Sequence, residues 1–142
     1  MRELIQGEVE LRTLLRSHRI NPTRQRVHIA RALFADVRHL SADDIFLRVN
    51  ATHPATSKAT VYNSLNLFVQ RGLLREVIAH PNKVFYDANT VPHYHFYDLD
   101  TGELTDIPTD HLSVTRLPEL PAGKVEEGVD IVIRIRSAST HC

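Results

Sequence analysis

The amino-acid sequence predicts an α+β protein in which an N-terminal winged helix-turn-helix domain precedes a small α/β domain. Three observations lead to this fold class. Apolar residues recur at helical spacing through much of residues 3–72. Two extended runs joined by a short turn follow directly. The rest of the chain is dominated by short alternating and β-branched runs.

Each of the four predicted helices has a local signal at one or both of its ends. The first occupies residues 3–18 and stops at the Asn-Pro-Thr segment 21–23. Gly72 is expected to end the fourth. The last three helices are expected to begin after hydroxyl side chains that cap the first turn, namely Thr23, Ser41, and Ser57 or Thr56. The apolar side chains expected in the core are Leu4, Ile5, Val9, Leu11, Leu14, Leu15, Val27, Ala30, Leu33, Phe34, Ile45, Phe46, Val49, Val61, Leu65, Phe68 and Val69.

The extended runs 73–80 and 83–89 are joined by the Pro-Asn pair 81–82, which predicts a β-hairpin. The helix before this hairpin also has a polar face. A polar helix followed by a two-stranded ribbon is typical of a winged helix-turn-helix, whose last helix enters the major groove of DNA. The polar side chains on that helix are Tyr62, Asn63 and Asn66.

The second half of the chain has the pattern of a small α/β unit. Residues 93–99 and 102–107 alternate around an Asp-Thr-Gly turn, which predicts another hairpin. Residues 110–117 are ambiguous between helix and loop. The β-branched run 125–137 predicts a strand with Ile131, Ile133 and Ile135 on one side. A unit of this size buries little core alone, so we expect it to pair with a second copy through this strand.

A net charge of zero hides an asymmetry between the two halves. Residues 1–83 contain 13 Lys and Arg against 7 Asp and Glu, whereas residues 84–142 contain 4 against 10. The basic half suits contact with phosphates, and the acidic half suits cations. The alternative is that both halves are simply solvated surfaces.

The single cysteine, Cys142, excludes an intramolecular disulfide and a four-cysteine zinc site. No apolar run is long enough to span a membrane, so no membrane contact is expected. Residues 1–15 lack the apolar core of an export signal. A cytoplasmic location is therefore expected.

Four segments together resemble the ferric uptake regulator family. They are PTRQRVHIARAL (22–33), HLSADDIFLRV (39–49), ATVYNSLNLFVQRGLLREV (59–77) and VFYDANTVPHYH (84–95). The resemblance implies a homodimeric, metal-responsive DNA-binding regulator, with a winged-helix DNA-binding domain in residues 1–88 and an α/β dimerisation and metal-sensing domain in residues 89–142. It also implies a pseudo-palindromic operator in double-stranded DNA, and a repressor of iron or peroxide response.

The His-x-His pair, taken by itself, indicates a metal site, a haem site or two solvated histidines. Side chains two residues apart point to the same side of a strand, so both imidazoles can converge on one ion. The resemblance implies one divalent ion per subunit, held by His39, Asp87, His93, His95 and Asp106. Carboxylate oxygens beside imidazoles favour Fe(II) or Mn(II), with Zn(II) as an alternative.

The sequence also departs from the family pattern. The first of the family's C-x-x-C pairs falls on Asp98 and Thr101 and no second pair exists, so no structural zinc is expected. The cysteine-poor hairpin is most similar to the iron response regulator branch, which binds haem, or to peroxide regulators. Haem would use His93, Tyr94 or His95. The family often has a further metal site that uses a histidine near the start of the last strand, a position that falls near Gly128 here; His111 and Glu126 offer a substitute.

The resemblance implies that Tyr62 contacts a thymine, and its ring can pack on the thymine methyl group. Asn63 stands where the family commonly has arginine, so a different preferred DNA sequence is expected. The basic residues expected either to contact phosphates or to be solvated are Arg19, Arg24, Arg26 and Lys58. The remaining histidines, which are His18, His28, His53, His80 and His141, are expected at the surface or at helix caps.

Two other classes of protein compete with a metal-responsive regulator. In a non-haem iron enzyme, His93, His95 and Asp106 would form a two-histidine, one-carboxylate triad with open positions. That leaves the basic helical half unexplained, and five ligands leave little room for a substrate. In the other class, the second half of a DNA-binding protein serves dimerisation alone.

Overall fold

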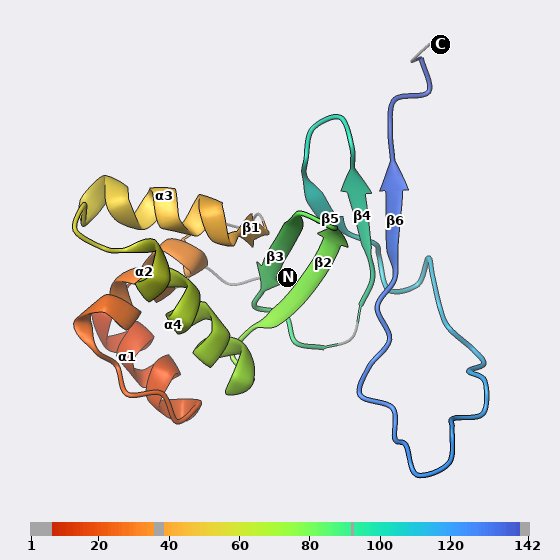
Figure 1. The fold of residues 1–142 in the computed structure, drawn as a ribbon, viewed down its shortest axis with the longest axis horizontal. Helices are drawn as coiled ribbons and strands as arrows, with labels where there is room; N and C mark the ends of the chain where they lie inside the picture. The colour runs from red at the N-terminus through yellow and green to blue at the C-terminus, as the bar shows by residue number, and fades with distance from the viewer. Residues whose placement is uncertain (1–6, 36–38, 92, 140–142) are drawn as a thin grey trace. The chain divides into compact units, whose positions relative to one another are not determined.

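The structure, a computed structural model, describes residues 7–35, 39–91 and 93–139. The chain divides into two compact units, Met1–Thr90 and Val91–Cys142 (Figure 1). In the described part of the chain, no helix is both long and apolar enough to cross a membrane. The α+β class predicted from the sequence is confirmed, because helices dominate the first unit and each unit contains a small sheet.

The described residues of the first unit form four helices and a three-stranded sheet. Its elements are α1 (Glu8–Ser17), α2 (Arg24–Phe34), β1 (Leu40–Ser41), α3 (Ala42–Thr52), α4 (Lys58–Gln70), β2 (Arg75–His80) and β3 (Lys83–Asp87). The sheet has the order β1-β3-β2 with antiparallel pairing throughout. The hairpin predicted over residues 73–89 is therefore present.

The core of this unit contains most of the apolar residues predicted for it. Leu11 and Leu15 of α1 are fully buried, as are Val61, Leu65 and Phe68 of α4. Leu4 and Ile5 lie outside the described residues. The prediction for Val9 was wrong, because its side chain is 76% exposed. Residues 11 and 15 define the buried side of α1, and position 9 lies about 140° away from the middle of that side around a helix of 3.6 residues per turn.

The predicted helix starts are confirmed by hydrogen bonds in the first turns. The Thr23 side chain accepts from the backbone N–H of Arg26. Ser41 and Asp44 form a reciprocal capping box at α3. Of the two candidates for α4, Ser57 is the N-cap and accepts from the N–H of Thr60.

The helices α1 and α4 end in the same motif. At α4, Gly72 has φ 77° and the N–H of Leu73 donates to the carbonyl of Phe68. At α1, the corresponding left-handed position is occupied by Arg19, with φ 60°. A residue with a Cβ is strained in this conformation, and glycine is not. Arg19 is the one non-glycine residue with positive φ among those described.

The second unit contains a three-stranded sheet of order β5-β4-β6. Its strands are β4 (His95–Asp98), β5 (Leu104–Asp106) and β6 (Val132–Ile135). Strand β4 pairs antiparallel with β5 and parallel with β6. The described residues of this unit contain no helix, and the ambiguous segment 110–117 is a loop. Strand β6 is shorter than the run 125–137 that predicted it.

Candidate metal centre and nucleic-acid interface

In the second unit, two histidines meet one carboxylate at the start of β4. His95 is the first residue of β4 and pairs across the ladder with Asp106, the last residue of β5. The Nε2 atoms of His93 and His95 each lie 3.2 Å from Oδ1 of Asp106. Both histidine side chains are nearly buried, whereas Asp106 is about half exposed. The sheet register places His95 opposite Asp106, and His93, just before the strand, adds a third potential ligand at the same oxygen.

The tautomer of His93 follows from its second hydrogen bond. Its Nδ1 lies 2.7 Å from the carbonyl oxygen of Val91. A carbonyl can only accept, so Nδ1 is the donor in this contact, which leaves Nε2 as the ring nitrogen available to an ion. Nε2 faces a carboxylate oxygen, an arrangement that favours a cation between the two. An imidazole whose other nitrogen donates to a carbonyl is the usual form of a metal ligand.

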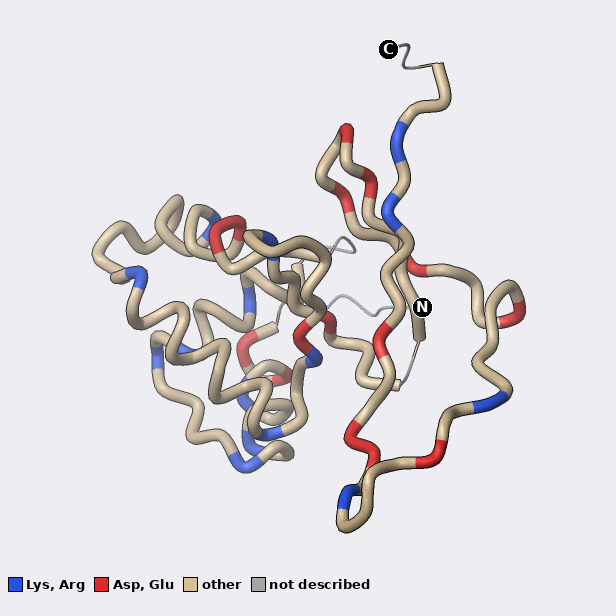
Figure 2. The backbone as a smooth tube through the Cα atoms, turned by 45° about the vertical axis from the view of Figure 1, so that its right-hand side comes forward, with Lys and Arg blue, Asp and Glu red and all other residues tan. Residues whose placement is uncertain are grey.

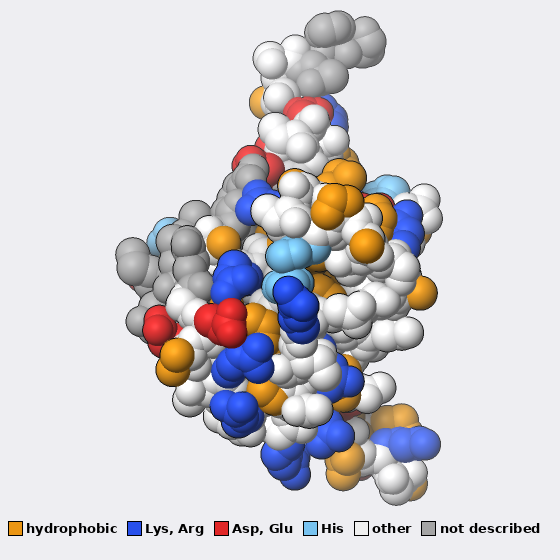
Figure 3. Space-filling view, turned by 90° about the vertical axis from the view of Figure 1, so that its left-hand side faces the viewer, with side chains coloured by type: hydrophobic (Ala, Val, Ile, Leu, Met, Phe, Trp, Pro, Cys, Tyr) orange, Lys and Arg blue, Asp and Glu red, His pale blue; other side chains and the backbone are white. Residues whose placement is uncertain are grey.

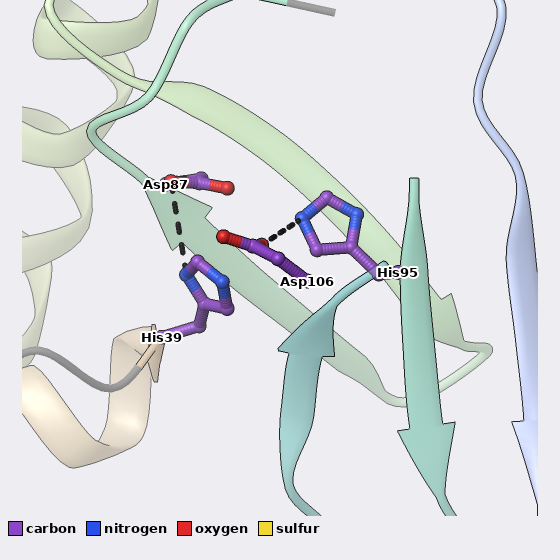
Figure 4. A group of neighbouring side chains, drawn as sticks. All are labelled: His39, Asp87, His95 and Asp106. Atoms are coloured by element: carbon purple, nitrogen blue, oxygen red, sulfur yellow. Dashed lines mark ion pairs between the residues drawn. The ribbon is translucent and has the colours of Figure 1, made fainter. Parts of the chain in front are cut away.

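In the first unit, His39 and Asp87 lie at one end of the β1–β3 ladder. The pairing of Leu40 with Tyr86 brings their neighbours in sequence, His39 and Asp87, side by side. Nδ1 of His39 lies 3.7 Å from Oδ1 of Asp87 (Figure 4). Asp87 is 1% exposed, and Oδ1 also accepts from the N–H of Asn89 at 2.9 Å. A carboxylate this deeply buried requires donors or a cation around it.

The chemistry of these five side chains suits a divalent cation. Imidazole nitrogen and carboxylate oxygen are ligands of Fe(II), Mn(II) and Zn(II). The side chains fit such an ion by donor type and, for His93, by tautomer. Figure 4 shows one ion pair from each unit, His39 with Asp87 and His95 with Asp106.

The hairpin that lacks cysteines is held by hydrogen bonds instead. Oδ1 of Asp98 accepts from the N–H of Asp100 at 2.8 Å and of Thr101 at 3.2 Å. Oδ2 of Asp100 accepts from the N–H of Ser137 at 2.6 Å. Hydrogen bonds from Ser137 lower the pKa of Asp100. The tip of the β4–β5 hairpin is thereby joined to the chain after β6.

The other proposed ligands are less well placed. His111 is 66% exposed and lies 3.8 Å from Asp110. A substitute second metal site at His111 and Glu126 stays a prediction. Tyr94 is half-buried, and its carbonyl accepts from the N–H of Ile107. A role for Tyr94 toward haem stays a prediction.

The exposed face of α4 carries the side chains expected to contact DNA. Tyr62, Asn63 and Asn66 are exposed, whereas Val61 and Leu65 are buried. The Tyr62 hydroxyl donates to Oδ1 of Asp43 at 3.0 Å. Nζ of Lys58 lies 3.6 Å from the same oxygen. Asp43 was not among the residues expected to contact DNA. Its contacts depend on the packing of α3 against α4, which no local sequence pattern indicates.

The three arginines proposed for phosphate contact differ in their surroundings. Arg24 is exposed near the start of α2, and Arg19 is exposed at the end of α1. Arg26 is half-buried, and Nη1 donates to the carbonyl of Asn21 at 3.0 Å. That bond ties α2 to the preceding turn and gives Arg26 a structural role. Arg26 also borders a hollow of about 420 Å³ beside Asn63.

Basic side chains are concentrated on the first unit. Figure 2 shows many Lys and Arg positions along its helices and frequent Asp and Glu along the second unit. Figure 3 shows one face on which basic side chains gather beside histidine side chains. Such a face attracts phosphate.

His28 and His53 stack on each other, with ring centroids 3.4 Å apart and planes inclined by 5°. His53 is the C-cap of α3, which agrees with the cap role expected for some of these histidines. Partial burial, followed by the charges of His53, Arg31 and Arg24, lowers the pKa of His28. The contact joins α2 to the end of α3.

Comparisons with known proteins agree on one family. The model of the ferric uptake regulator family matches residues 17–124. The peroxide-responsive repressor PerR of Staphylococcus aureus strain Mu50 is 32% identical over 99 residues, which are 70% of this chain and 67% of that protein.

Solved structures show the same fold. The ferric uptake regulator of Vibrio cholerae matches with a TM-score of 0.68 at 18% identity, covering 89% of this chain and 98% of that one. The ferric uptake regulator of Pseudomonas aeruginosa with manganese matches with a TM-score of 0.64 at 23% identity, covering 89% and 96%. At these identities the likeness shows the fold alone.

Proposed function

Because the chain belongs to the ferric uptake regulator family, it is a metal-responsive transcriptional regulator and not an enzyme, and we propose that it acts as a homodimeric repressor whose affinity for an operator depends on one divalent ion per subunit. The winged-helix unit binds the DNA. The second unit dimerises and contributes most of the metal ligands.

The observation that carries this proposal is the pair of histidine nitrogens that face one oxygen of Asp106, each at 3.2 Å. We assign His93, His95 and Asp106 to the ion together with His39 and Asp87. Only six peptide units join Asp87 to His93. An extended chain of that length spans at most ~20 Å, so the two parts of the ligand set cannot separate far.

An ion held by ligands from both units restrains the winged helix relative to the dimerisation unit. Ion binding and DNA binding are then coupled, and the coupling free energy is the same in both directions. Operator DNA should therefore change the affinity for the ion by the same factor as the ion changes the affinity for the operator. The three histidines and two carboxylates favour Fe(II) or Mn(II) over tetrahedral Zn(II).

The ligand assignment is tested by Mn(II) titration, followed by calorimetry, of wild-type protein and two matched pairs of variants. His93→Gln and Asp106→Asn should each weaken Mn(II) binding at least ~10-fold, because each removes a ligand. His111→Gln and Asp110→Asn change the same residue types at exposed positions nearby and should bind normally. Equal affinities in all four variants would refute the site.

DNA recognition is tested on the α4 face. Tyr62→Ala should weaken operator binding by about 1–3 kcal/mol if the ring reads a base, and should leave binding to random duplex nearly unchanged. Arg24→Ala should weaken binding to all duplexes alike and reduce the salt dependence, because a phosphate contact carries no sequence information. Equal losses on operator and random DNA for Tyr62→Ala would remove that residue from base readout.

Dimerisation is proposed to use β6. This strand forms an edge of its sheet, and Ile133 and Ile135 on it are 40% and 39% exposed. An apolar edge strand is a ready surface for a second copy. Ile133→Asp should convert the dimer to monomers in sedimentation equilibrium. Val125→Asp, at a 90% exposed site outside the sheet, should leave the dimer intact.

A response to peroxide is the second candidate, favoured by the 32% identity to a peroxide-responsive repressor. With Fe(II) in the site, hydrogen peroxide is expected to add one oxygen atom to the imidazole ring of His39 or His93, while its other oxygen leaves as water. Peptide mass spectrometry should then show a gain of one oxygen in the Fe(II) form and none in the Mn(II) form. Unmodified histidines in both forms, with DNA binding that follows iron or haem, would favour an iron-status regulator instead.

A further inference from the structure

A carboxylate from α3 holds two side chains of the DNA-facing helix. Asp43, in the first turn of α3, accepts a hydrogen bond from the Tyr62 hydroxyl at 3.0 Å. The same carboxylate oxygen lies 3.6 Å from Nζ of Lys58. Tyr62 and Lys58 lie four residues apart on α4, so they occupy one side of that helix. All three side chains belong to the winged-helix unit.

The hydrogen bond defines the direction of the tyrosine ring. Tyr62 is 36% exposed, and its side chain has only two rotatable bonds before the ring. Beside the contact is a hollow of about 220 Å³, whose lining includes Ser41, Glu76 and Lys83. The ring has room to turn there once its hydroxyl is released. Asp43 therefore selects one orientation among those that the space allows.

The ion pair between Asp43 and Lys58 weakens phosphate binding. The side chains of Asp43 and Lys58 are 68% and 61% exposed, so their contact is readily exchanged. A carboxylate oxygen resembles a phosphate oxygen in charge and in accepting hydrogen bonds. Any duplex that approaches Lys58 must displace Asp43 or bind beside its negative charge. This cost falls on all DNA, whatever its sequence.

We propose that Asp43 is a specificity-determining residue of the DNA-binding face. It holds Tyr62 in the orientation that reads a base, and its charge weakens the binding of duplexes that offer Tyr62 no matching base. Specificity is a difference between two affinities, and a repulsive element raises it when only the correct partner compensates. The inference rests on the proposed DNA-binding function and deepens it, because it assigns discrimination to a residue outside α4.

The test begins with a duplex selected from a random library by the wild-type protein. Binding of this duplex and of an unselected duplex is then measured by fluorescence anisotropy over a range of salt concentrations. Asp43→Asn keeps an oxygen that can accept from Tyr62 but removes the charge. Asp43→Ala removes both, and Tyr62→Phe removes only the hydroxyl. Glu10→Gln removes an exposed charge from α1 and serves as the control.

With Asp43→Asn, binding of the unselected duplex should rise about two- to fivefold, the range expected for an exposed ion pair. The slope of log affinity against log salt concentration should steepen by about 0.9 per subunit as Lys58 gains a phosphate. Asp43→Ala should show the same gain on unselected DNA and, in addition, weaker binding of the selected duplex. Tyr62→Phe should lose affinity for the selected duplex without a gain on unselected DNA.

Two outcomes are distinguishable failures. If the wild-type protein selects no sequence, the proposed function fails and the inference fails with it. If the wild type selects a sequence but the Asp43 variants match Glu10→Gln on both duplexes, the inference alone is wrong. Thermal melts check that each variant is folded. Asp43→Asn tests the effect of the charge on DNA binding even if Asp43→Ala is destabilised.

Discussion

Replacing Arg19 by glycine should make the protein more stable and, at the same time, a weaker DNA binder. Arg19 has φ 60°, and its N–H donates to the carbonyl of Arg16 at 2.9 Å. The N–H of Ile20 closes the motif on the carbonyl of Leu15 at 2.9 Å. These bonds keep Arg19 in the left-handed region, which α4 fills with glycine at the corresponding position, Gly72.

The expected gain comes from two opposing effects. A left-handed conformation costs a residue with a Cβ about 1–2 kcal/mol. Glycine loses more backbone entropy on folding, which offsets about 0.5–1 kcal/mol of the stability gained by removing the strain. The free energy of unfolding should therefore rise by about 0.5–1 kcal/mol for Arg19→Gly. If Arg19 contacts a phosphate, the salt slope of DNA binding should also fall by about 0.9 per subunit.

Urea unfolding followed by circular dichroism at fixed protein concentration measures the first effect, and anisotropy against salt concentration measures the second. Arg19→Ala is the matched control, because it removes the charge but keeps a Cβ at positive φ. It should match Arg19→Gly in DNA binding and show no gain in stability. Equal stabilities for the two variants would refute the strain argument. Unchanged salt slopes in both would remove Arg19 from the DNA contacts.

Three further predictions concern stability and assembly. Ser41→Ala should lower the free energy of unfolding by about 1 kcal/mol in urea titrations, because it breaks the capping box of α3. Since the pKa of His28 in the folded protein lies below its ordinary value of 6.5, its contribution to stability should be complete above pH 6.5 and be lost as the pH falls through the lowered value. Unfolding measurements between pH 7.5 and 5 should show this loss of stability. If His28→Gln loses as much stability over the same pH range, the loss belongs to other groups. After exhaustive chelation the protein should stay a folded dimer in sedimentation, because its hairpin is closed by Asp98 and Asp100 rather than by a zinc; unfolded monomers would reveal a structural metal.

The helices and their caps were determined by the sequence because their signals are local. A cap such as Ser41 and its partner Asp44 lie within one turn, so both are read from neighbouring letters. The wing hairpin is equally local, since its strands are joined by two residues. Pairing of His93 with His95 was also expected from their spacing, because side chains repeat every two residues along a strand. In the structure His93 lies just before β4, which begins at His95.

Other features depend on residues far apart in the chain, and only the tertiary structure decided them. Asp43 reaches Tyr62 across 19 positions, and His28 stacks on His53 across 25. Sequence patterns expected a second unit with helical content, yet its described residues contain strands and loops alone, and Val114 and Leu117 of the loop 110–117 are exposed. Periodicity reports which side of an element is apolar. Packing between elements decides which partner covers that side and which carboxylate faces which hydroxyl.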